Sequence, residues 1–198
     1  MKIIGLCGQS GAGKTTALET FTALGFAVID CDLISRQVTE KGSECLSELV
    51  EFFGDSILDT DGTLKRRTLA DLAFSDEKRL EALNSITHAH ILKAVFSQIE
   101  KYREDGYSAV VVDAPTLFES GLDRDCDTTL AICAPRDIRL ERIMKRDGIS
   151  LERAEARISK QISEEELRRL CDRVIYNGGS ETEFKEKIEN YVKEQSLE

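Results

Sequence analysis

The segment that most constrains the fold is a glycine-rich stretch close to the N-terminus. It reads Gly8-Gln9-Ser10-Gly11-Ala12-Gly13-Lys14-Thr15 and fits the pattern G-x-x-x-x-G-K-[ST] without a gap. A short apolar run from Lys2 to Cys7 precedes it, and a helical pattern follows from Lys14 to about Leu24. Because the motif belongs between a buried strand and a helix, this context predicts a phosphate-binding loop.

The residue types of this loop indicate how it holds a nucleotide. Glycines allow positive φ, so backbone N–H groups can turn inward around an anion, and the following helix adds its positive end. We expect Lys14 to neutralise the β- and γ-phosphates, Thr15 to complete the shell of a Mg²⁺ ion, and Thr16 to cap the helix or touch the α-phosphate. The predicted nucleotide-binding residues are Gly8, Gly11, Ala12, Gly13, Lys14, Thr15 and Thr16.

Short apolar runs alternate with helical patterns along the chain, which is typical of an α/β fold with a parallel sheet. These runs predict five strands, at 2–7, 26–29, 109–113, 129–133 and 173–176. Between 33 and 102 the strand pattern stops and helical spacing takes over, interrupted by a turn signal at 59–62. We therefore expect a parallel five-stranded sheet flanked by helices, with a helical insertion.

A second, charge-rich helical stretch runs from about 137 to 170 and breaks at 147–150, where Ser150 can cap a second helix. Such a helical hairpin is suited to closing over a ligand. We thus predict one 198-residue domain in three parts, with the sheet core at 1–32, 103–136 and 171–198, the insertion at 33–102 and a lid at 137–170.

Composition narrows the class of protein further. The formal net charge of −10 argues against a nucleic-acid or anionic-membrane partner. No apolar run approaches the roughly 20 residues that span a bilayer, and the first residues lack the layout of a signal peptide. Six scattered cysteines without a CxxC pair favour reduced thiols. We expect a cytoplasmic protein, either monomeric or a small homo-oligomer, whose partners are small molecules.

Two features favour a small-molecule kinase over other nucleotide-binding proteins. Asp32 follows the second predicted strand, at the sheet edge where ligands bind, and can accept a hydroxyl proton or help position Mg²⁺. The alternative is a carboxylate that caps the next helix, and Asp30 is the weaker candidate for the base. A switching GTPase is excluded, because the sequence lacks an N-K-x-D segment and a D-x-x-G segment after the third strand.

The second feature is a row of arginines. Arg139, Arg142 and Arg146 fall on one face of a helix, and Arg157 and Lys160 form a shorter cationic face beyond Gly148. Guanidinium groups fixed in this way can stabilise a phosphoryl group during transfer. The alternative is a solvated face whose arginines pair with Glu141, Glu152 and Glu155.

Sequence spacing alone does not decide the roles of two further residues, Asp113 and His88. Asp113 ends an apolar strand, so its carboxylate can either reach the waters of a Mg²⁺ ion or accept backbone N–H groups. His88 can contact a ligand as a single donor, whereas a metal site with His90 is excluded by their different helix faces.

Several segments beyond the loop resemble the dephospho-CoA kinase family in order along the chain. They are Val28 to Val38, Phe53-Gly54 with Asp61 to Arg66, Leu83 to His88, Asp113 to Leu122, Arg142 to Gly148, Arg157, Gln161 and Val174 to Asn177. The resemblance covers about Met1 to Ser180. The chain departs from the family pattern at Cys7, Gln9, Ala89, Thr116 and Tyr176.

The resemblance implies a P-loop kinase that transfers the γ-phosphate of ATP to the 3′-hydroxyl of dephospho-CoA, with the insertion at 33–102 as the CoA-binding sub-domain. It implies Asp32 as the base, with Lys14, Arg142 and Arg146 handling the phosphates. The acceptor would be held by His88, Leu117, Phe118 and Glu119. Two alternatives stay open, which are a kinase for another small hydroxyl acceptor and a catalytically silent nucleotide-binding module.

Overall fold

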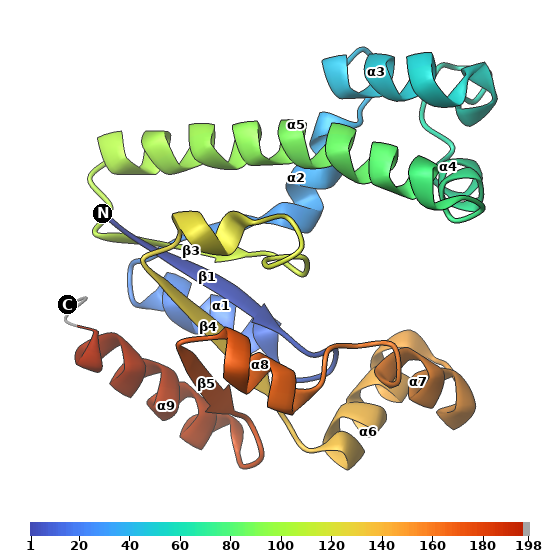
Figure 1. The fold of residues 1–198 in the computed structure, drawn as a ribbon. Coiled ribbons are helices and arrows are strands. Elements are labelled where there is room, and N and C mark those ends of the chain that lie inside the picture. The colour runs from blue at the N-terminus through green and yellow to red at the C-terminus, as the bar shows by residue number, and fades with distance from the viewer. Residues whose placement is uncertain (196–198) are drawn as a thin grey trace. The chain divides into compact units, whose positions relative to one another are not determined.

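The computed structural model describes residues 1–195 and contains the expected parallel sheet (Figure 1). Its strands are β1 (Lys2–Gly8), β2 (Ala27–Asp30), β3 (Ala109–Asp113), β4 (Thr128–Cys133) and β5 (Arg173–Tyr176). The strand order is β2-β3-β1-β4-β5, and β1 pairs in parallel with both β3 and β4. The strand that leads into the glycine-rich loop is therefore central, with neighbours on both sides.

The chain divides into two compact units. The sheet unit comprises Met1–Ile29 and the chain from Tyr102 onward, and the helical unit comprises Asp30–Lys101. The helical unit holds α2 (Cys31–Val38), α3 (Glu44–Phe53), η1 (Asp55–Ile57), α4 (Arg66–Ala73) and most of α5 (Glu77–Glu104).

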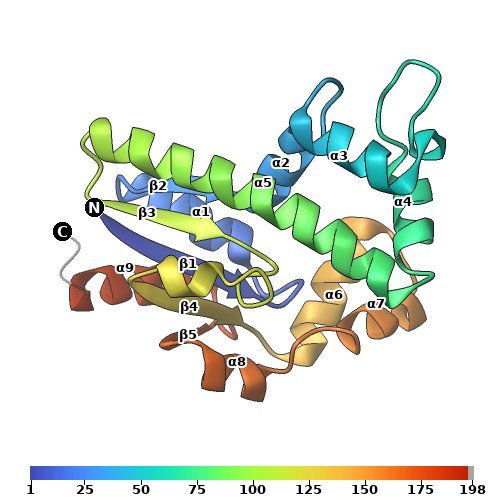
Figure 2. The same cartoon turned by 45° about the horizontal axis from the view of Figure 1, so that its top comes forward.

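The sheet unit buries both faces of its sheet. Ile4 and Leu6 of β1 point to one face, where they pack with Phe21 of α1 (Lys14–Ala23) and Phe184 of α9 (Glu181–Glu194). Strand residues alternate between faces, so Gly5 points to the other one, against Leu117 and Cys126. Figure 2 shows η2 (Leu122–Asp125) in front of β1 and β4, with α1 and α9 behind the sheet.

The helical unit has a small core of its own. Cys45 and Leu49 of α3 are buried together with Ile57 and Leu69. The chain between η1 and α4 makes the turn that the sequence predicts, in which the Gly62 N–H donates to the Asp59 carbonyl at 2.9 Å. Ser43 caps α3 by accepting a hydrogen bond from the Leu46 N–H.

The segment between β4 and β5 contains three helices where the sequence indicated a two-helix hairpin. They are α6 (Arg136–Asp147), α7 (Leu151–Ile158) and α8 (Glu164–Leu170). Ser150 caps α7, as predicted, but Ser163 caps a further helix by accepting from the Glu166 N–H. α8 packs against β4 and β5 because Leu167 is apolar and fully buried there, which the charge-rich sequence around it conceals.

No helix within residues 1–195 combines the length and the apolar character that crossing a membrane requires.

Replacing Phe21 by alanine should lower the free energy of unfolding by about 3–5 kcal/mol, because the ring is fully buried between Phe26 and Tyr191. Urea denaturation of the Phe21→Ala variant measures this change. Phe74→Ala is the matched control, since Phe74 is 74% exposed and its loss should change stability by less than about 0.5 kcal/mol. Equal losses in both variants would contradict this description of the core.

Candidate active site

The glycine-rich loop links the end of β1 at Gly8 to the start of α1 at Lys14 and needs glycine at its turns. Gly11 has φ 77°, and a Cβ there would lie 2.8 Å from the backbone oxygen of Arg139. Gly13 has φ 104°, and a Cβ there would collide with the side-chain nitrogen of Asn177. Backbone conformation and close packing together therefore exclude other residue types at both positions.

The N-terminus of α1 is left open for an anion. Gly13 is the N-cap and provides no side-chain hydrogen bond, and the first turn contains no acidic residue. The N–H groups at a helix start lack partners within the helix, and together they carry a partial positive charge. An anionic phosphate can therefore take the place that a capping side chain occupies in α3 or α7.

Three side chains from α6 and the end of β5 hold the outward carbonyl groups of the loop. The Arg139 Nε donates to the Ser10 oxygen at 3.1 Å, and the Arg142 Nη1 donates to the Gly11 oxygen at 3.2 Å. The Asn177 Nδ2 donates to the Ala12 oxygen at 2.8 Å, completing the set. We call these three side chains the carbonyl clamp.

The carbonyl clamp determines where the loop's N–H groups point. In a planar trans peptide the C=O of one residue and the N–H of the next point in opposite directions. Holding the Ser10 and Ala12 carbonyls outward thus directs the N–H groups of Gly11 and Gly13 to the inside of the loop. The Ala12 N–H is used differently, because it donates to the Gln9 carbonyl at 3.1 Å.

The turn before α8 supports the clamp from outside. The Gln161 Oε1 accepts from the Arg139 Nη2 at 2.6 Å and from the Ser10 N–H at 3.1 Å. The Gln9 Nε2 donates to the Ile162 carbonyl at 3.2 Å. Arg139 is 5% exposed, and this burial lowers the pKa of its guanidinium. It therefore serves the loop's structure, whereas helical spacing suggested that it faces the phosphates from a lid.

Arg146 and Arg157 both pair with Asp147, a carboxylate that the sequence analysis did not consider. Asp147 binds Arg146 through two hydrogen bonds of 2.7 and 2.9 Å and also pairs with Arg157 of α7. Hydrogen bonds from Arg146, and then from Arg157, lower the pKa of Asp147 to about 2. The expected partner Glu155 pairs instead with Arg136 of α6, so ion pairs at both Asp147 and Glu155 join α6 to α7.

Lys14 lies beside the carboxylate that ends β3. Its Nζ is 3.3 Å from the Asp113 Oδ1, and both side chains are partly shielded from solvent. Asp113 is aligned with Leu6 of β1, so the parallel register brings the two charges to the same edge of the sheet. This contact does not decide between the two predicted roles of Asp113, which are reaching the waters of a Mg²⁺ ion and accepting backbone N–H groups. A carboxylate beside Lys14 lies near the proposed phosphate site in both cases.

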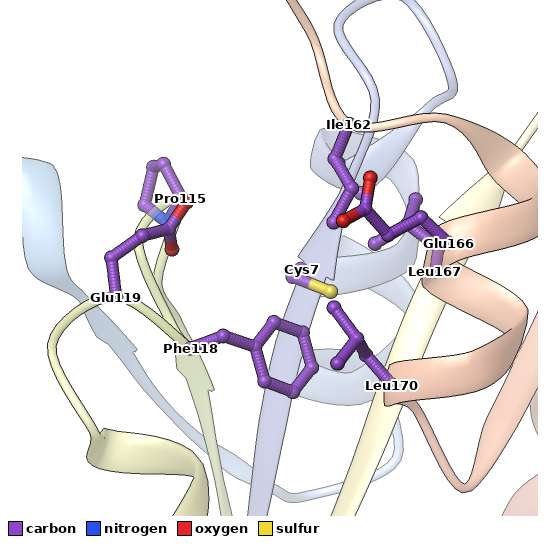
Figure 3. A pocket seen from close by; sticks show the side chains of 9 residues that line it. Cys7, Pro115, Phe118, Glu119, Ile162, Glu166, Leu167 and Leu170 are labelled. Carbon is purple, nitrogen blue, oxygen red and sulfur yellow. The ribbon is translucent and has the colours of Figure 1, made fainter.

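A cavity of about 330 Å³ opens next to the start of the loop. Figure 3 shows Phe118 and Glu119 on one side of it, Ile162, Glu166 and Leu170 on the other, and Cys7 between them. Phe118 and Glu119, which the sequence predicted as acceptor contacts, therefore line one cavity. Leu117 does not line it, because its side chain is fully buried against Gly5.

The other two predicted residues, Asp32 and His88, belong to the helical unit. The carboxylate of Asp30 caps α2 by accepting from the Leu33 N–H at 3.0 Å, whereas Asp32 is exposed in the first turn. Helix capping therefore explains Asp30 and leaves Asp32 for another role. His88 is half-buried on α5, and its neighbour His90 lies 3.0 Å from the Glu48 carboxylate.

Comparison with known proteins identifies the family. The sequence model of the dephospho-CoA kinase family matches residues 2–183. The chain belongs to the dephospho-CoA kinase family. A dephospho-CoA kinase from Staphylococcus aureus is 38% identical over 98% of this chain and 93% of its own length.

Solved structures agree with this assignment. TT1252 from Thermus thermophilus has a TM-score of 0.83 and 31% identity, covering 98% of this chain and 97% of its own. The dephospho-CoA kinase from Campylobacter jejuni has a TM-score of 0.72 and 27% identity, covering 99% and 98%. The predictions of the family, of a P-loop kinase fold and of a phosphotransferase enzyme are confirmed.

The sequence analysis did not predict that the side chains of the carbonyl clamp hold the backbone of the loop. Asn177 and Gln161 entered only as parts of the family resemblance, and Arg139 was assigned to the lid. The position of Asn177, directly after the last strand and before two glycines, was the available signal. Nothing in the sequence indicates that its amide reaches a carbonyl 165 residues earlier in the chain.

Replacing Asn177 by aspartate should raise the dissociation constant for ATP about tenfold, which corresponds to about 1.4 kcal/mol. The carboxylate cannot donate to the Ala12 carbonyl, so the Gly13 N–H loses its fixed direction. Isothermal titration calorimetry with Mg²⁺ present measures the change. Asn190→Asp on the exposed side of α9 adds the same charge and should leave the affinity unchanged. Equal affinities in all three proteins would contradict the clamp's role.

Proposed function

We propose that the chain transfers the γ-phosphoryl group of ATP to the 3′-hydroxyl of dephospho-CoA, giving coenzyme A, ADP and a proton. The observation that carries the proposal is the open, clamped P-loop beside the cavity of Phe118 and Glu119, in a chain of this family. Phosphoryl transfer needs phosphates held in place, stabilisation of their charge and a group that accepts the hydroxyl proton.

The triphosphate is held by the loop and by nearby cations. The N–H groups of Gly11 and Gly13 and the start of α1 bind its oxygens, and Lys14 exchanges Asp113 for the β- and γ-phosphates. Arg142 uses one N–H for the Gly11 carbonyl and has further donors for a phosphate, because a guanidinium carries five. Arg146 must leave Asp147 to bind the nucleotide, so phosphate and carboxylate compete for it.

Asp32 accepts the proton of the acceptor hydroxyl as that oxygen attacks the γ-phosphorus. Its exposed carboxylate, in the first turn of a helix that starts directly after β2, supports this role. Because Asp30 caps that helix, the capping explanation for Asp32 loses its basis. In parallel sheets, the carboxyl ends of the strands are the edge at which substrates meet.

The residues around the loop suit Mg²⁺ bound with ATP. Thr15 is exposed in the first turn of α1, and Asp113 supplies a carboxylate near Lys14, so both can contribute the oxygen ligands that this ion prefers. Residues 1–195 contain no group of three or more His, Cys, Asp or Glu side chains that could hold a metal ion. This fits an ion that is mostly coordinated by phosphates and water, where it would neutralise phosphate charge.

The acceptor occupies the cavity beside the loop. The Phe118 ring can stack against a base, and the Glu119 carboxylate can accept hydrogen bonds from sugar hydroxyls. His88 is a further candidate contact to the acceptor. Of the lid predicted at 137–170, residues 137–160 keep that role, because α8 packs against β4 and β5. A cytoplasmic location and a monomeric or small homo-oligomeric state complete the proposal.

A coupled ADP-release assay with ATP, Mg²⁺ and dephospho-CoA tests the function directly. Adenosine, AMP and shikimate serve as parallel acceptors. We expect ADP only with dephospho-CoA, and a product with the mass of coenzyme A. ADP formed with another acceptor would show that the chain is a kinase whose substrate is not dephospho-CoA. ATP binding without turnover on any acceptor would favour the catalytically silent module.

Replacing Asp32 by asparagine should lower turnover by about 10²–10⁴, while the affinity for ATP changes less than a few-fold. Steady-state kinetics and calorimetry on the same preparation separate the two effects. Asp30→Asn is the matched control, because asparagine caps a helix as well as aspartate does and should preserve α2. A similar rate loss in both variants would point to α2's structure and remove Asp32 from the chemistry.

A further inference from the structure

Two cysteine thiols meet directly below the P-loop. The Sγ atoms of Cys7 and Cys171 are 3.5 Å apart, and both residues are buried free thiols, 3% and 8% exposed. Cys7 is the last residue of β1 before Gly8, and Cys171 follows α8 directly. The two residues lie 164 positions apart in sequence, so the fold alone brings them together.

The pair can be reached from solvent through the cavity. Cys7 is one of its lining residues, and Figure 3 shows its sulfur between Phe118 and Leu170. The cavity is large enough for molecules much bigger than water, at about 330 Å³. A small oxidant can therefore reach Cys7 without unfolding of the sheet.

The surroundings distinguish Cys171 from the neighbouring thiols. The hydrogen bond between the two thiols lowers the pKa of Cys171, while that bond and burial raise the pKa of Cys7. By contrast, burial raises the pKa of Cys133 to about 11 and that of Cys126 to about 12. Because the two sulfurs are in contact, either thiol can be oxidised first and the other can then attack it.

We propose that Cys7 and Cys171 form a reversible oxidation site, in which a peroxide converts the two thiols into a disulfide. The thiolate of one cysteine attacks one oxygen of hydrogen peroxide, which gives a sulfenic acid and hydroxide. The sulfur of the other cysteine, having lost its proton to the hydroxide, then attacks the sulfenic sulfur, and the S–S bond forms as the sulfenic oxygen leaves as hydroxide. The pair loses two electrons and the peroxide gains them, and a thiol reductant reverses the reaction.

The disulfide should alter the wall of the cavity. An S–S bond is about 2.05 Å long, so the sulfurs must approach by roughly 1.5 Å. The backbone of Cys7 cannot supply this movement, because β1 is paired on both sides. Asp172 is also fixed, since its carboxylate accepts from the Thr129 N–H at 2.7 Å. The shift therefore falls on Cys171 and the end of α8, where Leu167 and Leu170 line the cavity.

Peptide mapping after peroxide treatment tests the site itself. The full chain is treated with hydrogen peroxide, remaining thiols are alkylated, and trypsin digestion is carried out without reduction. Cys7 lies in the peptide Ile3–Lys14, Cys171 in Leu170–Arg173, and Cys126 with Cys133 in Asp125–Arg136. We expect Ile3–Lys14 linked to Leu170–Arg173, and its loss on treatment with dithiothreitol. A link from Cys7 to Asp125–Arg136, or oxidation of single cysteines without any link, would overturn the proposal.

Two variants provide the controls. Cys171→Ser should abolish the linked peptide, and Cys126→Ser, which removes a thiol from the same face of the sheet, should retain it. Thermal melts verify that each variant folds, with Cys171→Ala as a second replacement. In Cys171→Ser we expect no cross-link from Ile3–Lys14 to any other peptide. A link from Ile3–Lys14 to another cysteine peptide in that variant would contradict the specific pairing of Cys7 with Cys171.

The effect on activity rests on the proposed function, whereas the disulfide does not. Peroxide should lower ADP release severalfold at limiting acceptor in the unmodified chain and in Cys126→Ser, and dithiothreitol should restore it. Cys171→Ser should keep its activity under the same treatment. A disulfide without any loss of activity would refute the predicted change in the cavity wall. If dephospho-CoA is not the acceptor, peptide mapping still decides whether the site exists.

Discussion

The geometry of the nucleotide site depends on hydrogen bonds to three carbonyl groups that point away from the ligand. Arg139, Arg142 and Asn177 hold the backbone oxygens of Ser10, Gly11 and Ala12 outward. A glycine-rich loop has many accessible conformations, and its freedom opposes the alignment of N–H groups that binding an anion requires. The clamp removes that freedom in the free protein, so less ordering remains for the ligand to impose.

Several cationic side chains are likewise held in place, each by a carboxylate. Lys14 is held by Asp113, and Arg146 and Arg157 are held by Asp147. Each carboxylate keeps a cation in place and lowers the cost of concentrating positive charge at one edge of an acidic protein. In the proposed function, the phosphates take the place of these carboxylates as partners of the cations, so that nucleotide binding leaves no cation isolated.

Much of the fold could be predicted from local patterns. The strand at Arg173–Tyr176, the turn at 59–62 and the caps at Ser150 were found because each depends on neighbouring residues. α8 was not separated from the predicted hairpin, because five of its seven residues are charged, Leu170 is exposed and only Leu167 is buried. Helical spacing also assigned Arg139 to a lid that handles phosphates, since spacing cannot reveal that Gly11 packs against its backbone.

The sequence by itself determined the chemistry of the phosphate loop, the family and the order of strands and helices, because a motif and its flanking patterns are properties of adjacent residues. Tertiary structure alone decided what holds the loop, which carboxylates pair with Lys14 and Arg146, and that Cys7 meets Cys171. These contacts join residues far apart in the chain. Their distances arise from the parallel register of the sheet and from the packing of α6 and α8, which no local pattern encodes.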